Sequence, residues 1–413
     1  MDELVVCGWV GTRPRMGRMA HDGGWPVAIL GAVSQGRHVR FVHTSDWQLG
    51  MRPHLLNEGG AELFRQARLD AVRLVGQFAA DRGCEFVLVA GDVFESNQVD
   101  RRTVVQGLEA MASIRVPTYL LPGNHDPFDP GSVYRSETFS AHRPDNVEVL
   151  GQPGLVELKP GLALVAAPWA SKRPATDLVA DACRNVEPTP GLRILVGHGA
   201  VSSFEINRDN PATIQVTALE EALRTGCLHY AALGDRHSVT EVGERVWYSG
   251  SPEATDFGEV ASGYALLVEL SDDSCSVERL PTGRWRFLRQ EFDLASQNDL
   301  ETLRGWLTDQ PQKERTILRL GLTGTVTLGL KAQLDQLLEE QRELFAAIDW
   351  WETESDLVVL PDEGDFGPGK LSGFAEEARK RLMEQAQLAA EEGERERARA
   401  SLALLYRLAG AGE

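Results

Sequence analysis

The chain has 413 residues, which suffices for two or three domains, and its charged (25%) and hydrophobic (42%) fractions are those of an ordinary globular protein. No apolar run reaches the length needed to cross a bilayer, which excludes a helical membrane protein. The formal net charge of −19 disfavours non-specific binding to nucleic acid, which depends on Lys and Arg replacing phosphate counterions, although a local basic or metal-bearing cleft can override that average.

The cysteines indicate the redox setting. There are five, an odd number, and they lie far apart without any CxxC pair. This pattern argues against a disulfide scaffold and predicts a reducing, cytoplasmic setting in which each thiol is a small buried hydrophobe. The five are Cys7, Cys84, Cys183, Cys227 and Cys275.

The first 36 residues carry Gly, Arg and Met without helical or strand periodicity. Arginines and apolar residues are found in targeting peptides, but this segment has no apolar core followed by a small-residue cleavage site. We expect a poorly ordered extension over residues 1–36 and a folded chain that begins near Arg37.

Residues 37–283 alternate between strand-like and helix-like segments, which predicts an α/β layered domain. The apolar residues of segment 58–83 recur at helical spacing before Gly83 ends the pattern. A second helix is expected over 100–114. Strands are expected at 39–45, 85–91, 117–123, 162–168, 192–198, 230–235 and 245–250.

The pattern changes after residue 284. Strands at 285–294 and 316–324 flank an amphipathic helix at 295–310, and another helix is expected at 331–348, so residues 284–360 predict a small α+β capping domain. A Pro/Gly/Asp-rich linker begins at 360, and residues 371–410 are rich in helix-forming residues with mixed charges. The C-terminal helices either pack on their own domain or dock on a partner.

Polar residues follow five of the predicted strands at their carboxyl ends. Binding sites of open α/β sheets form outside these ends, so the side chains are expected to converge. Glycines directly precede four of these residues, where the chain turns sharply. The polar residues are Asp46 and Gln48 after the first strand, Asp92 after the second, Asn124, His125 and Asp126 after the third, His198 at a later strand, and Asp235 and His237 after the next.

The types of ligand select the chemistry. Carboxylates, amides and imidazoles without a thiolate suit manganese, iron or magnesium better than structural zinc. Seven candidate ligands are too many for one ion but suit two, with Asp92 as the natural bridging ligand. Taken singly, each motif could be a solvated turn or a hydrogen-bonded histidine, whereas five such motifs in one order favour a shared site.

Six segments, HTSDWQLG, VAGDVFES, LPGNHDP, LVGHGAV, ALGDRHS and VWYSGSPEATDFGE, resemble in their order the motifs of calcineurin-like metallophosphoesterases. More closely, they resemble the SbcD-type DNA repair exonucleases, over about residues 38–290. The resemblance implies a four-layer αββα sandwich with a small capping domain that helps to position DNA, followed by a helical C-terminal tail.

The resemblance also implies a role for each residue. One ion would be bound by Asp46, Gln48, Asp92 and His237, and a second by Asp92, Asn124, His198 and Asp235. His125 would face the scissile phosphate, and Asp126 would orient that region. The implied activity is exonuclease or endonuclease cleavage of DNA ends or single strands by a two-metal-activated hydroxide, in repair or end processing. The implied partner is an SbcC-like coiled-coil ATPase that binds the C-terminal helices, and a homodimer is compatible.

Two positions depart from the family pattern. Gln48 stands where the family has a histidine in D-x-H, and Asp235 stands where it has the first histidine of GHxH. Both changes replace nitrogen by oxygen, which favours harder ions such as manganese or magnesium. Two alternatives therefore stay open: a phosphoesterase of small nucleotides, which the acidic charge favours, and a catalytically degenerate scaffold subunit.

Overall fold

The computed structural model describes residues 37–184, 186–205, 210–360 and 373–388, with a few further positions between 393 and 405. The extension expected over residues 1–36 and the linker expected after residue 360 lie outside these residues, so both stay predictions.

The first sheet has six strands. Its strands β1 to β4 are parallel neighbours, and β11 and β12 add an antiparallel edge beside β1. The order across the sheet is β12 (Cys275–Pro281), β11 (Tyr264–Ser271), β1 (His38–Thr44), β2 (Phe86–Val89), β3 (Thr118–Leu120) and β4 (Val147–Val149).

The second sheet also has six strands. Its strands β6, β7, β8 and β10 are parallel, and an antiparallel strand closes each edge. The order is β5 (Gly154–Lys159), β6 (Leu162–Ala167), β7 (Leu192–His198), β8 (Tyr230–Gly234), β10 (Val246–Tyr248) and β9 (Thr240–Gly243). Both sheets are therefore mixed.

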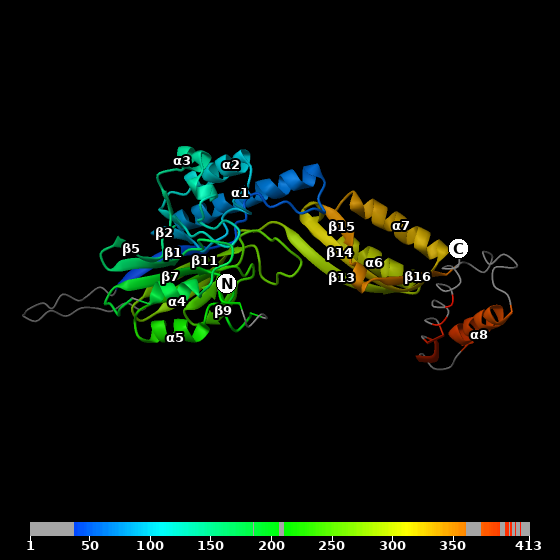
Figure 1. Cartoon of the computed structure of the whole chain (residues 1–413). Helices are drawn as coiled ribbons and strands as arrows, with labels where there is room; N and C mark the ends of the chain where they lie inside the picture. Colours follow the sequence, from blue (N-terminus) through cyan, green and yellow to red (C-terminus); the bar gives the residue numbers. More distant parts are fainter. Residues whose placement is uncertain are drawn as a thin grey trace, which may run out of the picture. The chain divides into compact units, whose positions relative to one another are not determined.

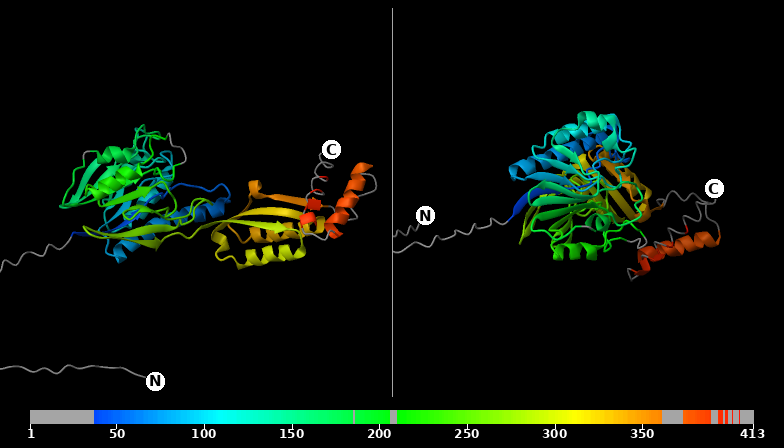
Figure 2. Two further views of the ribbon diagram at one scale, coloured as in Figure 1. Left: turned by 90° about the horizontal axis from the view of Figure 1, so that it is seen from below. Right: turned by 60° about the vertical axis from the view of Figure 1, so that its left-hand side comes forward.

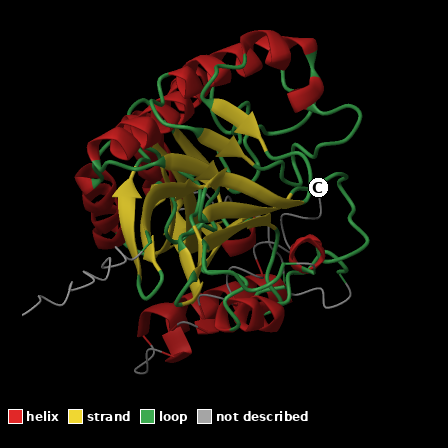
Figure 3. Ribbon diagram, turned by 90° about the vertical axis from the view of Figure 1, so that its left-hand side faces the viewer, coloured by secondary structure: helices red, strands yellow, loops and turns green. Residues whose placement is uncertain are grey.

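Helices cover the outer faces of the two sheets (Figures 1 and 3). The first sheet carries α1 (Glu58–Asp81), α2 (Arg101–Ala112), the 3-10 turn η1 (Val133–Arg135) and α3 (Glu137–His142), and the second carries α4 (Leu178–Cys183) and α5 (Val216–Arg224). One apolar core lies between the sheets, and one more lies between each sheet and its helices. The four-layer αββα sandwich expected from the sequence is confirmed.

Local sequence explains why these elements form. The Asn57 side chain accepts a hydrogen bond from the backbone N–H of Gly60 and so caps α1, and the predicted apolar face of this helix is buried at Phe64, Ala71 and Val75. All four residues of β2 are buried, which matches a strand covered on both faces. Strands β4, β5, β9, β11 and β12 were not predicted from the sequence.

A third sheet follows the sandwich. Its strands β13 (Arg286–Leu294), β14 (Thr316–Thr327), β15 (Ala347–Trp350) and β16 (Asp356–Leu360) all pair in parallel. Helices α6 (Gln297–Asp309) and α7 (Leu328–Arg342) connect them, with 3-10 turns at Lys313–Arg315 and Glu352–Glu354. Figure 2 shows these helices alongside the strands. The first two connections are β-α-β units, and β15 and β16 are joined through the 3-10 turn Glu352–Glu354.

The helix expected over 331–348 is corrected. It ends at Arg342, and Ala347–Trp350 pairs with β14 as a strand. The apolar residues of the segment continue a helix-like spacing, but the open edge of β14 offers backbone hydrogen bonds that fix the extended form.

The C-terminal region contributes α8 (Phe374–Leu388). This helix falls within the segment expected to be helical. Among the residues described, no helix has the length and apolar character to span a membrane.

Candidate metal centre

The predicted ligands leave neighbouring strands at the same edge of each sheet. Strands β1, β2 and β3 supply those of the first sheet, and β7 and β8 those of the second. The loops after β1 and β2 run side by side, because Asp46 N donates to Gly91 O over 3.0 Å and Gln48 N donates to Asp92 O over 2.9 Å. These backbone hydrogen bonds hold the first two motifs together before any ion is considered.

Four of the predicted ligands have left-handed backbone conformations. The φ angles are 53° at Asp46, 42° at Gln48, 54° at Asp92 and 96° at Asp235. Such angles are unfavourable for residues other than glycine and persist where surrounding structure enforces them, often at functional sites. The backbone therefore aims these side chains at the site at a cost in local strain.

Glycines permit the close approach of these loops. A Cβ atom at Gly91 would lie 2.1 Å from His198 Nδ1, and one at Gly123 would lie 2.1 Å from Asp92 Oδ1. At Gly234 it would lie 1.9 Å from the carbonyl oxygen of Ala90. No other residue fits at these positions without displacing a predicted ligand or its support.

His198 is the centre of one half of the site. Its Nδ1–H donates to Ala90 O over 2.8 Å, so Nε2 faces the predicted ligands. That nitrogen lies 2.7 Å from Asn124 Oδ1, 3.3 Å from Asp92 Oδ2 and 3.8 Å from Asp235 Oδ1. The structure thus brings the four residues of the predicted second ion together around one imidazole nitrogen.

His237 is the centre of the other half. Its Nε2 lies 3.7 Å from Asp46 Oδ1 and 3.2 Å from the side-chain nitrogen of Gln48. The backbone N–H of Asp235 donates to both carboxylate oxygens of Asp46, over 3.3 and 3.2 Å, and so joins the two halves. The residues predicted to bind the first ion therefore also lie close together.

Two groups that support His237 were missed from the sequence. Its Nδ1 lies 3.0 Å from Glu259 Oε1 and 2.6 Å from Thr255 Oγ1, and the Glu259 side chain is only 6% exposed. Both residues belong to the motif VWYSGSPEATDFGE and lie in a loop, not directly after a strand. The other candidate ligands were found because they directly follow predicted strands, so this criterion could not identify Thr255 and Glu259.

Arg68 was also missed. It lies in α1, is buried, and donates from Nη1 to the backbone carbonyl of Trp47 over 2.7 Å, between Asp46 and Gln48. Burial lowers the pKa of its guanidinium. A buried arginine hydrogen-bonded to this loop fixes the turn that carries the first two predicted ligands.

The electrostatics of the site fit a divalent cation. Burial raises the pKa values of Asp46 and Asp235, and neighbouring carboxylates add to both rises. For Asp92, burial is the largest single effect, but His198 and His125 together outweigh it, and the pKa is lowered. Ligand atoms of Asp46, Asp92 and His198 lie within 4.8 Å of one another. Clustered buried carboxylates are costly without a cation among them, so the donor set fits the ions that the sequence predicts.

His125 and Asp126 lie beside these ligands. The backbone N–H of His125 donates to Asp92 Oδ1 over 2.9 Å, and its Nδ1–H donates to Glu95 O over 3.0 Å. Asp126 accepts hydrogen bonds from the N–H groups of Phe94 and Gly123 and from the Tyr134 hydroxyl. Asp126 is fully buried, and these hydrogen bonds hold the loop that carries His125.

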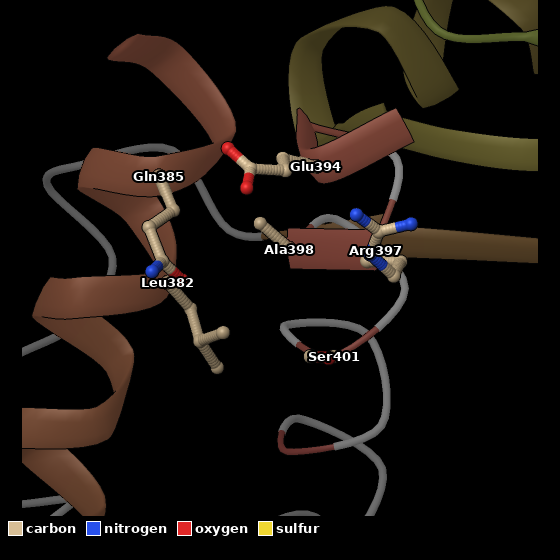
Figure 4. Close-up of a pocket in the computed structure, with 6 residues that line it drawn as sticks. All are labelled: Leu382, Gln385, Glu394, Arg397, Ala398 and Ser401. Carbon is tan, nitrogen blue, oxygen red and sulfur yellow. The ribbon is translucent and has the colours of Figure 1, made fainter. Parts of the chain in front are cut away.

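The C-terminal helices contain a pocket whose lining residues lie far along the chain from the predicted ligands. Figure 4 shows its mixed lining, which includes one carboxylate and one guanidinium. The lining contains none of the predicted ligands, and it consists of Leu382, Gln385, Glu394, Arg397, Ala398 and Ser401.

Two curated relatives share part of the sequence. The DNA double-strand break repair protein Mre11 of Methanosarcina acetivorans is 24% identical over 269 residues, which cover 62% of this chain and 41% of the relative. The protein of the same name from Methanococcus maripaludis is 32% identical over 91 residues, covering 21% of this chain and 23% of the relative. The chain thus spans less than half the length of the curated relatives it matches.

Solved structures with similar folds are more distant. A purple acid phosphatase from yellow lupin has a TM-score of 0.37 at 13% identity, covering 60% of this chain and 52% of that one. A dimetal phosphatase from Danio rerio has a TM-score of 0.35 at 10% identity, covering 58% of this chain and 98% of that one.

The family model for calcineurin-like phosphoesterases matches residues 39–263, which are more than half of the chain. The match includes both six-stranded sheets except β11 and β12, and every predicted ligand. The chain therefore belongs to the calcineurin-like phosphoesterases, and it is a metal-dependent hydrolase of phosphoesters.

Proposed function

We propose that the chain is a nuclease of the SbcD type, which hydrolyses phosphodiester bonds of DNA in repair or end processing in the cytoplasm. The two curated relatives, both DNA double-strand break repair proteins, support this substrate. So does the order of the six motifs. The ligand set of the proposal is Asp46, Gln48, Asp92, Asn124, His198, Asp235 and His237, with manganese as the preferred ion because oxygen donors predominate.

The position of His125 carries the proposal. It is anchored at its backbone by Asp92 and at Nδ1 by the carbonyl of Glu95, so its Nε2 is the nitrogen left to face a substrate. Its side chain is 38% exposed, whereas Asp46 and His198 are buried. An imidazole at the open side of a buried ligand cluster can protonate the leaving oxygen of a phosphodiester.

The ions would supply two things when bound: an activated water as nucleophile, and positive charge to balance the phosphate. The chain's own residues do the remainder. Asp92 and His198 hold the ligand geometry, and His125 donates a proton to the departing oxygen as its bond to phosphorus breaks. Ions held by these residues would also reduce the repulsion between an acidic chain and DNA, because they would supply positive charge at the site.

The test uses purified full-length protein with Mn²⁺ or Mg²⁺. End-labelled single- and double-stranded DNA is compared with bis-p-nitrophenyl phosphate and p-nitrophenyl phosphate, and Asp92→Asn is compared with the surface control Asp145→Asn. We expect DNA and diester cleavage that Asp92→Asn abolishes and Asp145→Asn keeps. Cleavage of only the small esters would contradict the DNA substrate. Absence of all cleavage would favour the degenerate scaffold, which Gln48 and Asp235 motivate.

The proposed partner is an SbcC-like coiled-coil ATPase that binds the C-terminal helices, with a homodimer of this chain in the complex. Helix α8 exposes Phe374 (90%) and Leu388 (73%), which are apolar side chains suited to a helical partner. Co-expression with such an ATPase should yield a complex, and Phe374→Glu with Leu388→Glu should disrupt it. Loss of the partner in this variant without loss of diester cleavage would separate docking from catalysis.

A further inference from the structure

The two halves of the site differ in their donors. Around His198, three oxygen donors lie within 3.8 Å of one ligand nitrogen, and two of them are carboxylates. Every one of these atoms can bind a cation in its present orientation. This half is therefore arranged for an ion without rearrangement of its side chains.

The half around His237 is arranged differently. The amide nitrogen of Gln48 lies 3.2 Å from His237 Nε2, within hydrogen-bond distance of that ring nitrogen. An amide binds cations through its oxygen, and its NH₂ group is a donor only. Gln48 must therefore turn its amide over to bind an ion, and even then it supplies a neutral oxygen. This half should have the lower affinity.

Glu259 compensates in part for this weakness. Its Oε1 lies 3.0 Å from Nδ1 of His237, so a carboxylate accepts the Nδ1–H and leaves Nε2 for an ion. A carboxylate behind a ligand histidine fixes the ring and increases its strength as a donor. His198 has only the neutral carbonyl of Ala90 in the corresponding place. The stronger support thus stands behind the half with the weaker ligand set.

We propose that the chain binds two divalent ions with unequal affinity, the weaker in the half that contains Gln48, and that Glu259 is a positioning residue for this weaker ion, acting through His237. The inference rests on the metal centre of the proposed function and does not require that DNA is the substrate. Thr255, whose hydroxyl lies 2.6 Å from the same Nδ1, shares in the support.

The test is a titration of ion-stripped full-length protein with Mn²⁺. Calorimetry and the electron paramagnetic resonance signal of free Mn²⁺ monitor the binding. Wild type should bind two ions in two steps. Glu259→Gln should weaken only the second step, by roughly 10–100-fold, the usual effect of losing such a support. Gln48→His should tighten only the second step, because it restores an imidazole. Glu241→Gln, which removes an exposed carboxylate on β9, should change neither step.

Thermal unfolding in EDTA shows whether each variant folds. Three results would each overturn the inference. Wild type could bind two ions with equal affinity, or both wild type and Gln48→His could bind a single ion. Glu259→Gln could also lose Mn²⁺ affinity equally at both steps. Unequal binding without any cleavage of DNA would leave the inference standing and would refute the nuclease proposal instead.

Discussion

The Nδ1–H of His198, the last residue of β7, donates to the backbone carbonyl of Ala90, which follows β2, over 2.8 Å. This hydrogen bond joins the two sheets directly behind the predicted ligands. It leaves Nε2 of the same ring facing Asn124 and Asp92. The contact exists only because Gly91, the next residue along the chain, has no side chain to occupy the space.

The first prediction concerns Gly91→Ala. The new methyl group would lie 2.1 Å from His198 Nδ1 on a backbone with φ of +95°, so the imidazole must move. We expect a loss of roughly 2–4 kcal/mol in the free energy of unfolding, from the left-handed conformation and from overpacking together. Displacement of the ring should also weaken Mn²⁺ binding. Urea unfolding in EDTA and calorimetric titration measure the two effects.

Gly83→Ala is the matched control. Gly83 also has positive φ (+62°), but a Cβ atom there would have no neighbour within 4 Å. The variant should lose only about 1–2 kcal/mol, the cost of the left-handed backbone, and should keep the wild-type affinity for Mn²⁺. Equal metal binding by the two alanine variants would show that contact with His198 is unimportant.

The second prediction concerns the hydroxyl of Tyr134. It donates to Asp126 Oδ2 over 2.6 Å, and both side chains are buried. Burial raises the pKa of Asp126 to about 6, and the Asp92 charge adds to the rise. Tyr134→Phe should cost about 1–3 kcal/mol, since a buried carboxyl oxygen loses a donor. Diester hydrolysis should also slow, because Asp126 holds the loop that carries His125.

Tyr119→Phe provides the comparison, because Tyr119 on β3 is only partly buried, at the edge of the core between the sheets. It should change the free energy of unfolding by less than about 0.5 kcal/mol and leave the rate unaltered. A normal rate in Tyr134→Phe despite reduced stability would mean that Asp126 stabilises the fold without orienting His125.

The sequence alone predicted the positions of the site residues better than their conformations. Asp46, Asp92 and His198 could be found because strands in an α/β sheet deliver polar residues at their carboxyl ends. The left-handed backbone at Gln48 could not, because side-chain type says little about φ in a loop that other loops constrain. That the predicted residues bind ions stays a prediction.

Residues that act from outside the strand ends were not predictable. Arg68 lies on the inner face of α1, where sequence periodicity suggests an apolar core position, and Glu259 follows a loop of no regular structure. Both reach the site through the tertiary fold. The third sheet shows the same limit, because β13 and β14 could be located, while the end of α7 and the strand β15 depended on pairing with β14.

The third prediction concerns pH and His43. This residue is fully buried between Tyr230, whose hydroxyl lies 3.1 Å from Nδ1, and the carbonyl of Leu233, 3.2 Å from Nε2. Burial lowers its pKa from 6.5 to about 3, against the opposing effect of the hydrogen bond to Leu233. Because the unfolded chain binds a proton below pH 6.5 and the folded chain does not, stability should fall as pH decreases from 6.5 towards 3.

By pH 5 this linkage removes about 2 kcal/mol, and the slope contributed by His43 approaches 1.4 kcal/mol per pH unit. His43→Leu should be less stable at pH 7.5, since two polar partners lose their hydrogen bonds, yet its stability should fall less steeply between pH 6.5 and 4.5. The exposed His142→Gln should keep the wild-type slope. Urea unfolding in EDTA at several pH values between 6.5 and 4.5 measures the free energy of unfolding and its slope for each variant. Identical slopes in wild type and His43→Leu would show that His43 is protonated in the folded state.

The fourth prediction separates stability from ion binding at Asp46. This carboxylate is fully buried, and burial together with the Asp92 charge raises its pKa, whereas His237 and His198 oppose the rise. In EDTA, Asp46→Asn should unfold at a higher temperature than wild type, because the variant removes one of several crowded negative charges and asparagine tolerates the left-handed backbone at this position.

Mn²⁺ should reverse that order. An ion that binds only the folded state at one hundred times its dissociation constant stabilises wild type by about 2.7 kcal/mol, and Asp46→Asn should gain much less because it has lost a ligand. Asp145→Asn, on the surface, should follow wild type in both conditions. If Mn²⁺ stabilised Asp46→Asn as much as wild type, Asp46 would not be a ligand, and the cluster of Asp46, Asp92 and His198 would need another explanation. If Asp46→Asn were instead less stable in EDTA, the hydrogen bonds that Asp46 accepts from Ser45 and from the backbone of Asp235 would outweigh the repulsion among the carboxylates.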